Sequence, residues 1–137
     1  MKILIVDGQG GRLGKQIIEA ILPGIAGHEL IAVGTNALAT AAMLKAGAPQ
    51  AATGENALCI NAASADLIVG PIGIISANSL LGEVTPRMAL AVGKSEAHKL
   101  LIPLNRCNLE VISLPKNATM SDMVAQTKVR ILELLKG

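Results

Sequence analysis

MKILIVDGQGGRLGK, residues 1–15, is the stretch that decides the fold. Residues 2–6 form a short apolar run rich in β-branched side chains, which is typical of a strand buried on both faces of a sheet. Glycines follow at once, and a helical pattern begins after Gly14, with Ile17, Ile18 and Ile21 on one side and polar residues on the other. A strand, a glycine loop and a helix in this order predict an α/β fold.

The glycine loop is a candidate anion site, because Gly8, Gly11 and Gly14 keep the spacing Gly-x-x-Gly-x-x-Gly of a variant dinucleotide fingerprint. Backbone N–H groups in such a turn approach a phosphate closely, and the unpaired amides and dipole of a helix start favour negative charge. Arg12 and Lys15 also favour a bound phosphate, since cations at a helix start are unfavourable unless an anion offsets them. The alternative is that the glycines only turn a tight corner between strand and helix. The candidate cofactor-binding residues of this loop are Asp7, Gly8, Gln9, Gly10, Gly11, Arg12, Leu13 and Gly14.

Length and composition exclude several classes of protein. The chain has 137 residues, enough for one domain over residues 1–137 with a sizeable core, and too few for a nucleotide domain plus a separate catalytic domain. A net charge of +2 and the lack of Phe, Tyr and Trp leave neither a basic stripe nor a stacking platform, so nucleic-acid binding is not expected. No signal-peptide pattern and no segment of membrane-spanning length is visible, so we expect a cytoplasmic protein without membrane contact.

The cysteines and histidines are too scattered to predict a metal site. Cys59 and Cys107 lie far apart, and only His28 and His98 accompany them. This spacing fits no zinc motif, and two reduced thiols are the default in a cytoplasmic chain. We therefore expect no bound metal.

Strand and helix patterns alternate along the rest of the chain. Strands are predicted at residues 2–6, 29–33, 50–52, 66–70 and 99–102, with an edge strand at 109–114. Helices are predicted between them, with caps at Thr35 or Asn36, Thr53 and Thr85, and a last helix capped by Thr119 with Asp122. This alternation predicts a single Rossmann-like three-layer domain with a mostly parallel sheet of about five or six strands in the order 3-2-1-4-5.

The end of the second predicted strand departs from the dinucleotide pattern. An Asp or Glu usually follows that strand and binds the ribose hydroxyls, whereas this chain has Gly34, Thr35 and Asn36. One interpretation is that Thr35 or Asn36 only caps the next helix. The other is that these residues receive a ribose or a 2′-phosphate, in which case the missing acid favours NADP over NAD. A P-loop is a poorer interpretation of the glycine loop, because Gln16 stands where a magnesium-binding hydroxyl is required.

Two further loops are expected at the same edge of the sheet, because ligands bind beyond the carboxyl ends of parallel strands. The first follows the fourth strand, overhangs the glycine loop and continues into the apolar stretch 74–82, which we expect to be buried. Its candidate cofactor-binding residues are Gly70, Pro71, Ile72 and Gly73. The second follows the fifth strand and carries a polar cluster. The candidates for substrate contact or support are Glu55, Asn56, Asn78, Asn105, Arg106 and Cys107.

These candidates also have plain structural interpretations. Glu55 can stabilise a helix start through the dipole. Arg106 could hold a carboxylate or phosphate and Cys107 could act as a nucleophile, but no His lies near either in the sequence to suggest a base. A solvated turn is the alternative for this segment, so the catalytic residues stay unassigned.

Two family resemblances arise from these motifs. Residues 8–18, GQGGRLGKQII, resemble the nucleotide-binding start of dihydrodipicolinate reductases, which implies NADH or NADPH binding. The chain departs from that family at the missing ribose acid and at Asp7, which would repel a pyrophosphate unless it turns away, bonds the loop amides or shares a divalent cation. The resemblance is limited to the amino-terminal segment and does not include the second, catalytic domain of those reductases.

The other resemblance spans nearly the whole chain. VDGQGG at 6–11, GTN at 34–36, ATGENA at 52–57, GPIGI at 70–74 and IPLN at 102–105 resemble a small bacterial family, the domain of unknown function 3842. These motifs fall on the loops predicted to gather at one end of the sheet. The resemblance implies the fold and the site and leaves the reaction open.

The leading hypothesis from the sequence is a nucleotide-binding protein of the NAD(P) type that could act as a small reductase. Because the chain places few catalytic groups near the predicted site, we expect a homodimer. The alternatives are a non-catalytic nucleotide sensor or a subunit of a larger complex, and an interaction module whose glycine loop is empty. The sequence does not decide whether the chain is an enzyme.

Overall fold

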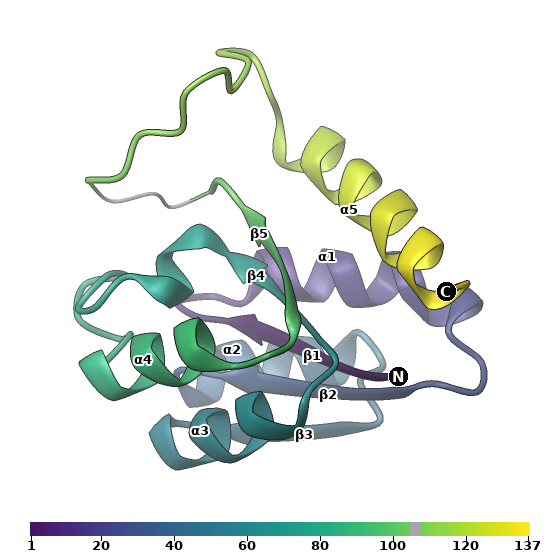
Figure 1. Ribbon diagram of the computed structural model, residues 1–137, viewed down its shortest axis with the longest axis horizontal. Helices are drawn as coiled ribbons and strands as arrows, with labels where there is room; N and C mark the ends of the chain where they lie inside the picture. The colour runs from purple at the N-terminus through teal and green to yellow at the C-terminus, as the bar shows by residue number, and fades with distance from the viewer. Residues whose placement is uncertain (105–107) are drawn as a thin grey trace.

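The sheet of this protein is parallel throughout and lies between two layers of helices (Figure 1). The computed structural model describes residues 1–104 and 108–137. Within them, strands pair in the order β3-β2-β1-β4-β5, and every neighbouring pair is parallel. Their bounds are β1 Lys2–Asp7, β2 Glu29–Gly34, β3 Gln50–Thr53, β4 Leu67–Pro71 and β5 His98–Ile102. The predicted Rossmann-like fold and its strand order are confirmed.

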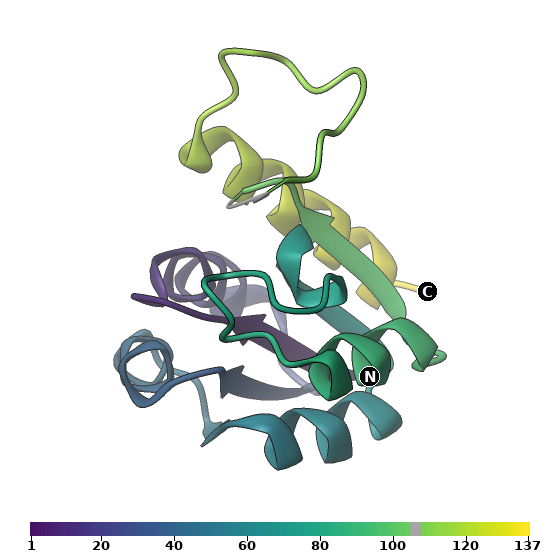
Figure 2. The same cartoon turned by 90° about the vertical axis from the view of Figure 1, so that its left-hand side faces the viewer.

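Helices cover both faces of the sheet, as the turned view in Figure 2 shows. α1, α2 and α5 pack on one face, and α3 and α4 pack on the other. The bounds of the α-helices are α1 Arg12–Ile21, α2 Ala37–Lys45, α3 Glu55–Ser64, α4 Pro86–Lys94 and α5 Met120–Leu135. Two short 3-10 helices are η1 Leu22–Gly24 and η2 Ile72–Ile75. Because helices fill both faces, the loops at the carboxyl ends of the strands are the place where a ligand can reach the sheet.

β1 is the central strand and is buried on both faces. Ile3 and Ile5 join the core under α1, α2 and α5, whereas Leu4 and Val6 join the core under α3 and α4. Side chains alternate along a strand, so the next residue, Asp7, falls on the α1 side. Its carboxylate therefore lies at the carboxyl end of the sheet, beside the start of α1.

Three helix caps are as predicted. The Asn36 side chain accepts from the first turn of α2, and the Thr85 side chain does the same for α4. Thr119 and Asp122 form a reciprocal capping box at the start of α5. These short-range signals were sufficient because each cap bonds an amide only three residues away.

Two predicted helix starts are wrong. The cap of α3 is Gly54 at a φ of 101°, and Thr53 instead ends β3 with its hydroxyl oxygen 2.7 Å from that of Thr40. α1 begins at Arg12 rather than after Gly14, because Gly11 makes the turn at a φ of 74°. Both turns use a left-handed conformation that favours glycine, so a glycine sets each start.

The edge strand predicted at 109–114 is also wrong. Residues 112 and 113 form a turn, the rest of the segment has no regular structure, and the described part of the chain contains no strand after β5. Residues 108–119 make a long excursion before α5, away from the edge of the sheet (Figure 1). Ile112 is 80% exposed, and Ser113 has a φ of 72°. An alternating pattern forms a strand only where it meets the edge of another strand, which this segment does not reach.

The stretch 74–82 is only partly the buried wall that its apolar composition predicts. Ile74 and Leu80 are buried, but Ile75 is 40% exposed and Leu81 is 96% exposed. The chain passes here through η2 and then through a loop of consecutive turns, so neighbouring apolar side chains point in different directions.

Candidate functional site

The glycine loop leads from the end of β1 into α1. The N–H of Gly11 donates to the carbonyl of Gly8 at 2.9 Å and closes a tight turn. A Cβ at Gly11 would lie 2.8 Å from the Cα of Ala39 in α2. A Cβ at Gly14 would lie 2.6 Å from the sulfur of Met43, also in α2. Gly11 and Gly14 therefore serve the close packing of α1 on α2.

The Asp7 side chain lies at the buried side of the start of α1. It is buried, and its Oδ1 and Oδ2 accept from the backbone N–H groups of Gly8 at 2.8 Å and Gly14 at 2.7 Å. Burial raises the pKa of the Asp7 carboxyl more than the loop N–H groups lower it, and the charge of Glu83 adds to the rise. Among the alternatives for Asp7, bonding of the loop amides is the one found. The negative charge that a helix start attracts is thus supplied by the chain itself.

Glu83, which no sequence motif marks, reaches across the glycine loop from the segment before α4. Its Oε1 accepts from the N–H of Gln9 at 2.8 Å, the hydroxyl of Thr35 at 2.7 Å and the side-chain amide of Asn36 at 2.8 Å. Burial opposes ionisation, but these hydrogen bonds prevail and lower the pKa of the Glu83 carboxyl. The contact with Gln9 joins residues 74 positions apart, so the only signal in the sequence is a carboxylate in a loop at the carboxyl end of the sheet.

The predicted residues at the end of β2 lie directly beside the glycine loop. Gly34 is opposite Asp7 in the sheet, and the N–H of Thr35 donates to the carbonyl of Asp7 at 3.0 Å. The Asn36 side chain also donates to the carbonyl of Gln9 at 3.0 Å. The structure therefore brings the two predicted segments together, and the chain itself engages their polar atoms.

The middle of the loop, in contrast, is open. The N–H groups of Gly10 and Arg12 have no acceptor among the residues that the structure describes. A Cβ at Gly10 would meet no atom within 4 Å. One cavity of about 180 Å³ is lined by Asp7, Gly8, Gln9, Gly10, Gly11, Arg12, Leu13 and Met120. A second cavity of about 260 Å³ shares Gly10 and is otherwise lined by Lys15, Leu38, Ala41, Ala42 and Lys45.

Glu55 is held by the start of α4. Its Oε2 accepts from the hydroxyl of Thr85 at 2.6 Å, and its Oε1 accepts from Arg87 Nη1 at 3.1 Å. Asn56 and Asn78 are exposed. These contacts favour the structural interpretation of Glu55, because both carboxylate oxygens already have partners.

The structure describes the predicted site residues after β4 but not those after β5. Pro71 ends β4, Ile72 and Gly73 begin η2, and the carbonyl of Gly73 accepts from the hydroxyl of Ser79. The loop after β4 therefore forms the base of the segment that carries Glu83. The candidates after β5, which are Asn105, Arg106 and Cys107, lie outside the described residues.

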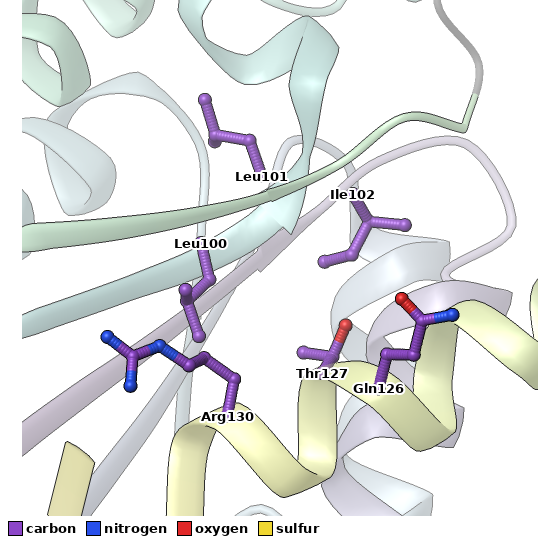
Figure 3. Close-up of a pocket in the computed structure, with 6 residues that line it drawn as sticks. All are labelled: Leu100, Leu101, Ile102, Gln126, Thr127 and Arg130. Atoms are coloured by element: carbon purple, nitrogen blue, oxygen red, sulfur yellow. The ribbon is translucent and has the colours of Figure 1, made fainter. Parts of the chain in front are cut away.

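Another cavity lies beside β5 and α5, among residues that are not part of the glycine loop (Figure 3). Its volume is about 210 Å³, and its lining is Leu100, Leu101, Ile102, Gln126, Thr127 and Arg130. Arg130 pairs with Glu133 at 3.1 Å, and the Thr127 hydroxyl donates to the carbonyl of Met123 at 2.7 Å. Arg130 and Thr127 therefore already have partners within α5.

The described residues lack the features that metal binding and membrane insertion require. No three His, Cys, Asp or Glu side chains in residues 1–104 and 108–137 gather closely enough to hold a metal ion. In the same part of the chain, no helix has both the length and the apolar character that crossing a membrane requires.

Comparison with known proteins supplies a family. The family model for the Domain of unknown function (DUF3842) matches residues 2–136, so the chain belongs to that family. No curated protein matches the chain. Among solved structures, the dodecameric FMN-dependent Ubix-like decarboxylase from Escherichia coli O157:H7 is similar, with a TM-score of 0.43 and 16% identity over 100% of this chain and 96% of that chain. A likeness at this level transfers no ligand or activity, so a function has to be argued from the residues of the site.

Proposed function

We propose that this protein binds a phosphate-bearing nucleotide at the middle of its glycine loop, with NAD(P) as the leading ligand. The supporting observation is the open segment at Gly10 and Arg12, whose N–H groups have no acceptor among the described residues and which borders a cavity of about 180 Å³. Free backbone amides at a helix start are a site for anions. The exposed guanidinium of Arg12 can add a charge-assisted hydrogen bond to the same phosphate.

A nucleotide would have to extend beyond the cavity at Gly10. Sites for drug-sized ligands measure about 300–1,000 Å³, whereas this cavity measures about 180 Å³. The cavity of about 260 Å³ shares Gly10 and is also lined by Lys15 and Lys45. A dinucleotide that crosses Gly10 would place a second phosphate near these lysines.

The two carboxylates at the loop set a condition on this binding. Asp7 and Glu83 both accept from loop amides, and a like charge at about 4 Å opposes a phosphate by about 4 kcal/mol at an effective dielectric constant of about 20. A divalent cation can offset that repulsion. Ligands are therefore to be tested with and without magnesium.

The more specific proposal is that the protein is a small reductase. It would act as a homodimer, in which a second copy supplies the catalytic groups that this loop lacks. A non-catalytic nucleotide sensor or a subunit of a larger complex is the second candidate. The engagement of Glu55 with Thr85 and Arg87 favours this second candidate, because it removes a free carboxylate from the list of catalytic groups. Turnover of NADH or NADPH by the purified protein supports a reductase, whereas tight binding without turnover supports a sensor.

The test of binding is a thermal-shift screen with NAD, NADP, their reduced forms, ATP, GTP, flavins and S-adenosylmethionine, each with and without magnesium. A ligand at a hundredfold excess over its Kd stabilises the native state by about 2.7 kcal/mol. The Gly10→Val variant fills the open segment and should abolish the shift. Gly93→Val is the matched control, because a Cβ at Gly93 also meets no atom within 4 Å but lies on α4, away from the loop.

The outcomes of this screen separate the possibilities. A shift that Gly10→Val removes and Gly93→Val keeps supports the proposal. A shift that survives Gly10→Val places the ligand elsewhere and contradicts it. If no compound shifts either the native protein or Glu83→Ala, which frees the donors of Gln9, Thr35 and Asn36, the interpretation of the glycine loop as a structural corner is favoured.

A further inference from the structure

We infer that Glu83 is an internal stand-in for an anionic ligand, and that the 78–84 loop is a latch which a phosphate-bearing ligand must displace. The inference rests on the proposed function, because it concerns how that site is regulated. It adds a second anion position, at Gln9, Thr35 and Asn36, to the open one at Gly10 and Arg12.

The first step of the argument is the set of donors around one oxygen. Oε1 of Glu83 receives a backbone N–H, a hydroxyl and a side-chain amide, all at 2.7–2.8 Å. Such short bonds to an ionised oxygen are charge-assisted and strong. Three converging donors are also what a phosphate oxygen requires, so the carboxylate fills a receptor for an oxyanion.

The second step is steric. A Cβ at Gly8 would lie 2.6 Å from Oγ1 of Thr35, 2.8 Å from Cδ1 of Leu80 and 3.0 Å from Oε1 of Glu83. The latch therefore lies directly on the first glycine of the loop. In a dinucleotide fingerprint the glycines let the backbone approach the pyrophosphate. A phosphate cannot make that approach at Gly8 while Leu80 and Glu83 are in place and Glu83 holds the Thr35 hydroxyl beside Gly8.

The third step concerns how the latch moves. The N–H of Asn78 donates to the carbonyl of Val84 at 2.7 Å, so the two ends of the loop are joined. Between them Leu80, Leu81 and Gly82 all have positive φ, at 55°, 56° and 89°. Left-handed leucines are strained, and the Leu81 side chain is 96% exposed. The closed loop therefore carries backbone strain that opening can release, and opening also has to withdraw the buried side chains of Leu80 and Val84 from the core.

The competing interpretation is that Glu83 is itself a ligand-binding group. The acid that usually binds ribose hydroxyls is missing after β2, and Glu83 brings a carboxylate to Thr35 and Asn36 at that position. The two interpretations predict opposite effects of removing the carboxylate. A latch lowers the apparent affinity of the ligand, whereas a ribose-binding acid raises it.

The deciding experiment is titration calorimetry of NADP+ and of inorganic pyrophosphate with the native protein, Glu83→Ala and Glu83→Gln. The matched control is Glu96→Ala, which removes the same charge from an exposed position. We expect Glu83→Ala to bind both probes at least tenfold more tightly, Glu83→Gln to fall between, and Glu96→Ala to bind like the native protein. If Glu83→Ala does not fold, Glu83→Gln alone must still bind more tightly.

The failures of the two proposals are distinguishable. If the native protein binds and Glu83→Ala binds equally or more weakly, the latch is wrong and the nucleotide site stands. If neither protein binds NADP+ or pyrophosphate, the proposed function fails for these ligands, and the latch fails with it. If only Glu83→Ala binds, both proposals are supported.

A fluorescent reporter tests the movement itself. The chain has no Trp, so Leu81→Trp introduces a single fluorophore at the exposed tip of the latch. We expect its emission to change when NADP+ or pyrophosphate binds. Val129→Trp on α5, at a side chain that is 57% exposed, should not respond. Binding without a change at Leu81→Trp would contradict the displacement of the latch.

Discussion

The first and second parts of the glycine loop are built differently, although one motif runs through both. From Asp7 to Gln9, the chain's own carboxylates accept from the loop N–H groups. At Gly10 and Arg12, the described residues supply no acceptor, and a cavity of about 180 Å³ lies beside them. The difference teaches that a glycine fingerprint marks a tight turn at a helix start, whereas the residues around it decide which amides remain for a ligand.

The largest expected effect is on the free energy of unfolding, and it tests the difference between the two parts of the loop at the adjacent glycines Gly10 and Gly11. Gly11→Ala should lower the free energy of unfolding by about 2–4 kcal/mol, because a left-handed alanine is strained and its Cβ would lie 2.8 Å from the Cα of Ala39. Gly10→Ala should leave stability within about 1 kcal/mol of the native value, since its Cβ meets no atom within 4 Å. Urea unfolding followed by far-UV circular dichroism measures both, as the chain has no aromatic residue.

The pair of variants is its own control, because both make the same chemical change one position apart. Equal losses of stability would mean that Gly10 is as confined as Gly11, and the open segment would then not exist. An unaffected Gly11→Ala would show that α1 and α2 can separate without cost.

The next effect concerns the buried half of the loop. Asp7→Asn keeps the shape of the side chain but offers one oxygen to two N–H groups, so a buried amide loses its acceptor. We expect a loss of about 1–3 kcal/mol in the free energy of unfolding. Asp66→Asn is the control, because among the described residues only the N–H of Lys2 donates to that carboxylate, at 2.7 Å and at an exposed position, and one oxygen suffices. A stabilised Asp7→Asn would mean that the cost of burying the charge exceeds the value of its hydrogen bonds.

The fold could be predicted because its signals are local. The buried strand at residues 2–6 needs only its apolar run, and the cap at Asn36 needs only a bond three residues away. Alternation of strands and helices then favours a parallel sheet in the order that is found. The exceptions follow the same rule, since the edge strand predicted at 109–114 depended on a neighbour that this segment does not reach.

The candidate site could be predicted only in outline. Strand order brings residues 7–14 and 34–36 together, which the sequence indicates correctly. Glu83 could not be anticipated, because its role depends on a turn-rich loop with left-handed leucines that composition describes simply as apolar. Nor does any local pattern show that Asp7, rather than a ligand, would take the amides of Gly8 and Gly14.

The smallest expected effect is the pH dependence of the free energy of unfolding, which distinguishes the carboxylates of Glu83 and Asp7. The pKa of Glu83 is lowered in the folded state, so its contribution is present above the unfolded value of about 4.3 and is lost as pH falls through the folded value. Glu83→Gln should therefore cost about 1 kcal/mol at pH 7 and progressively less below about pH 4.

The contribution of Asp7 to the free energy of unfolding changes with pH in the opposite direction. Burial raises its pKa, so native stability falls as pH rises from the unfolded value of about 3.9 through the folded one. Relative to the native protein, the deficit of Asp7→Asn should shrink with rising pH, whereas the deficit of Glu83→Gln should grow. Urea unfolding of the three proteins at several values between about pH 3 and pH 7 gives both slopes. Two slopes of the same sign would mean that the two carboxylates do not differ in the way their contacts indicate.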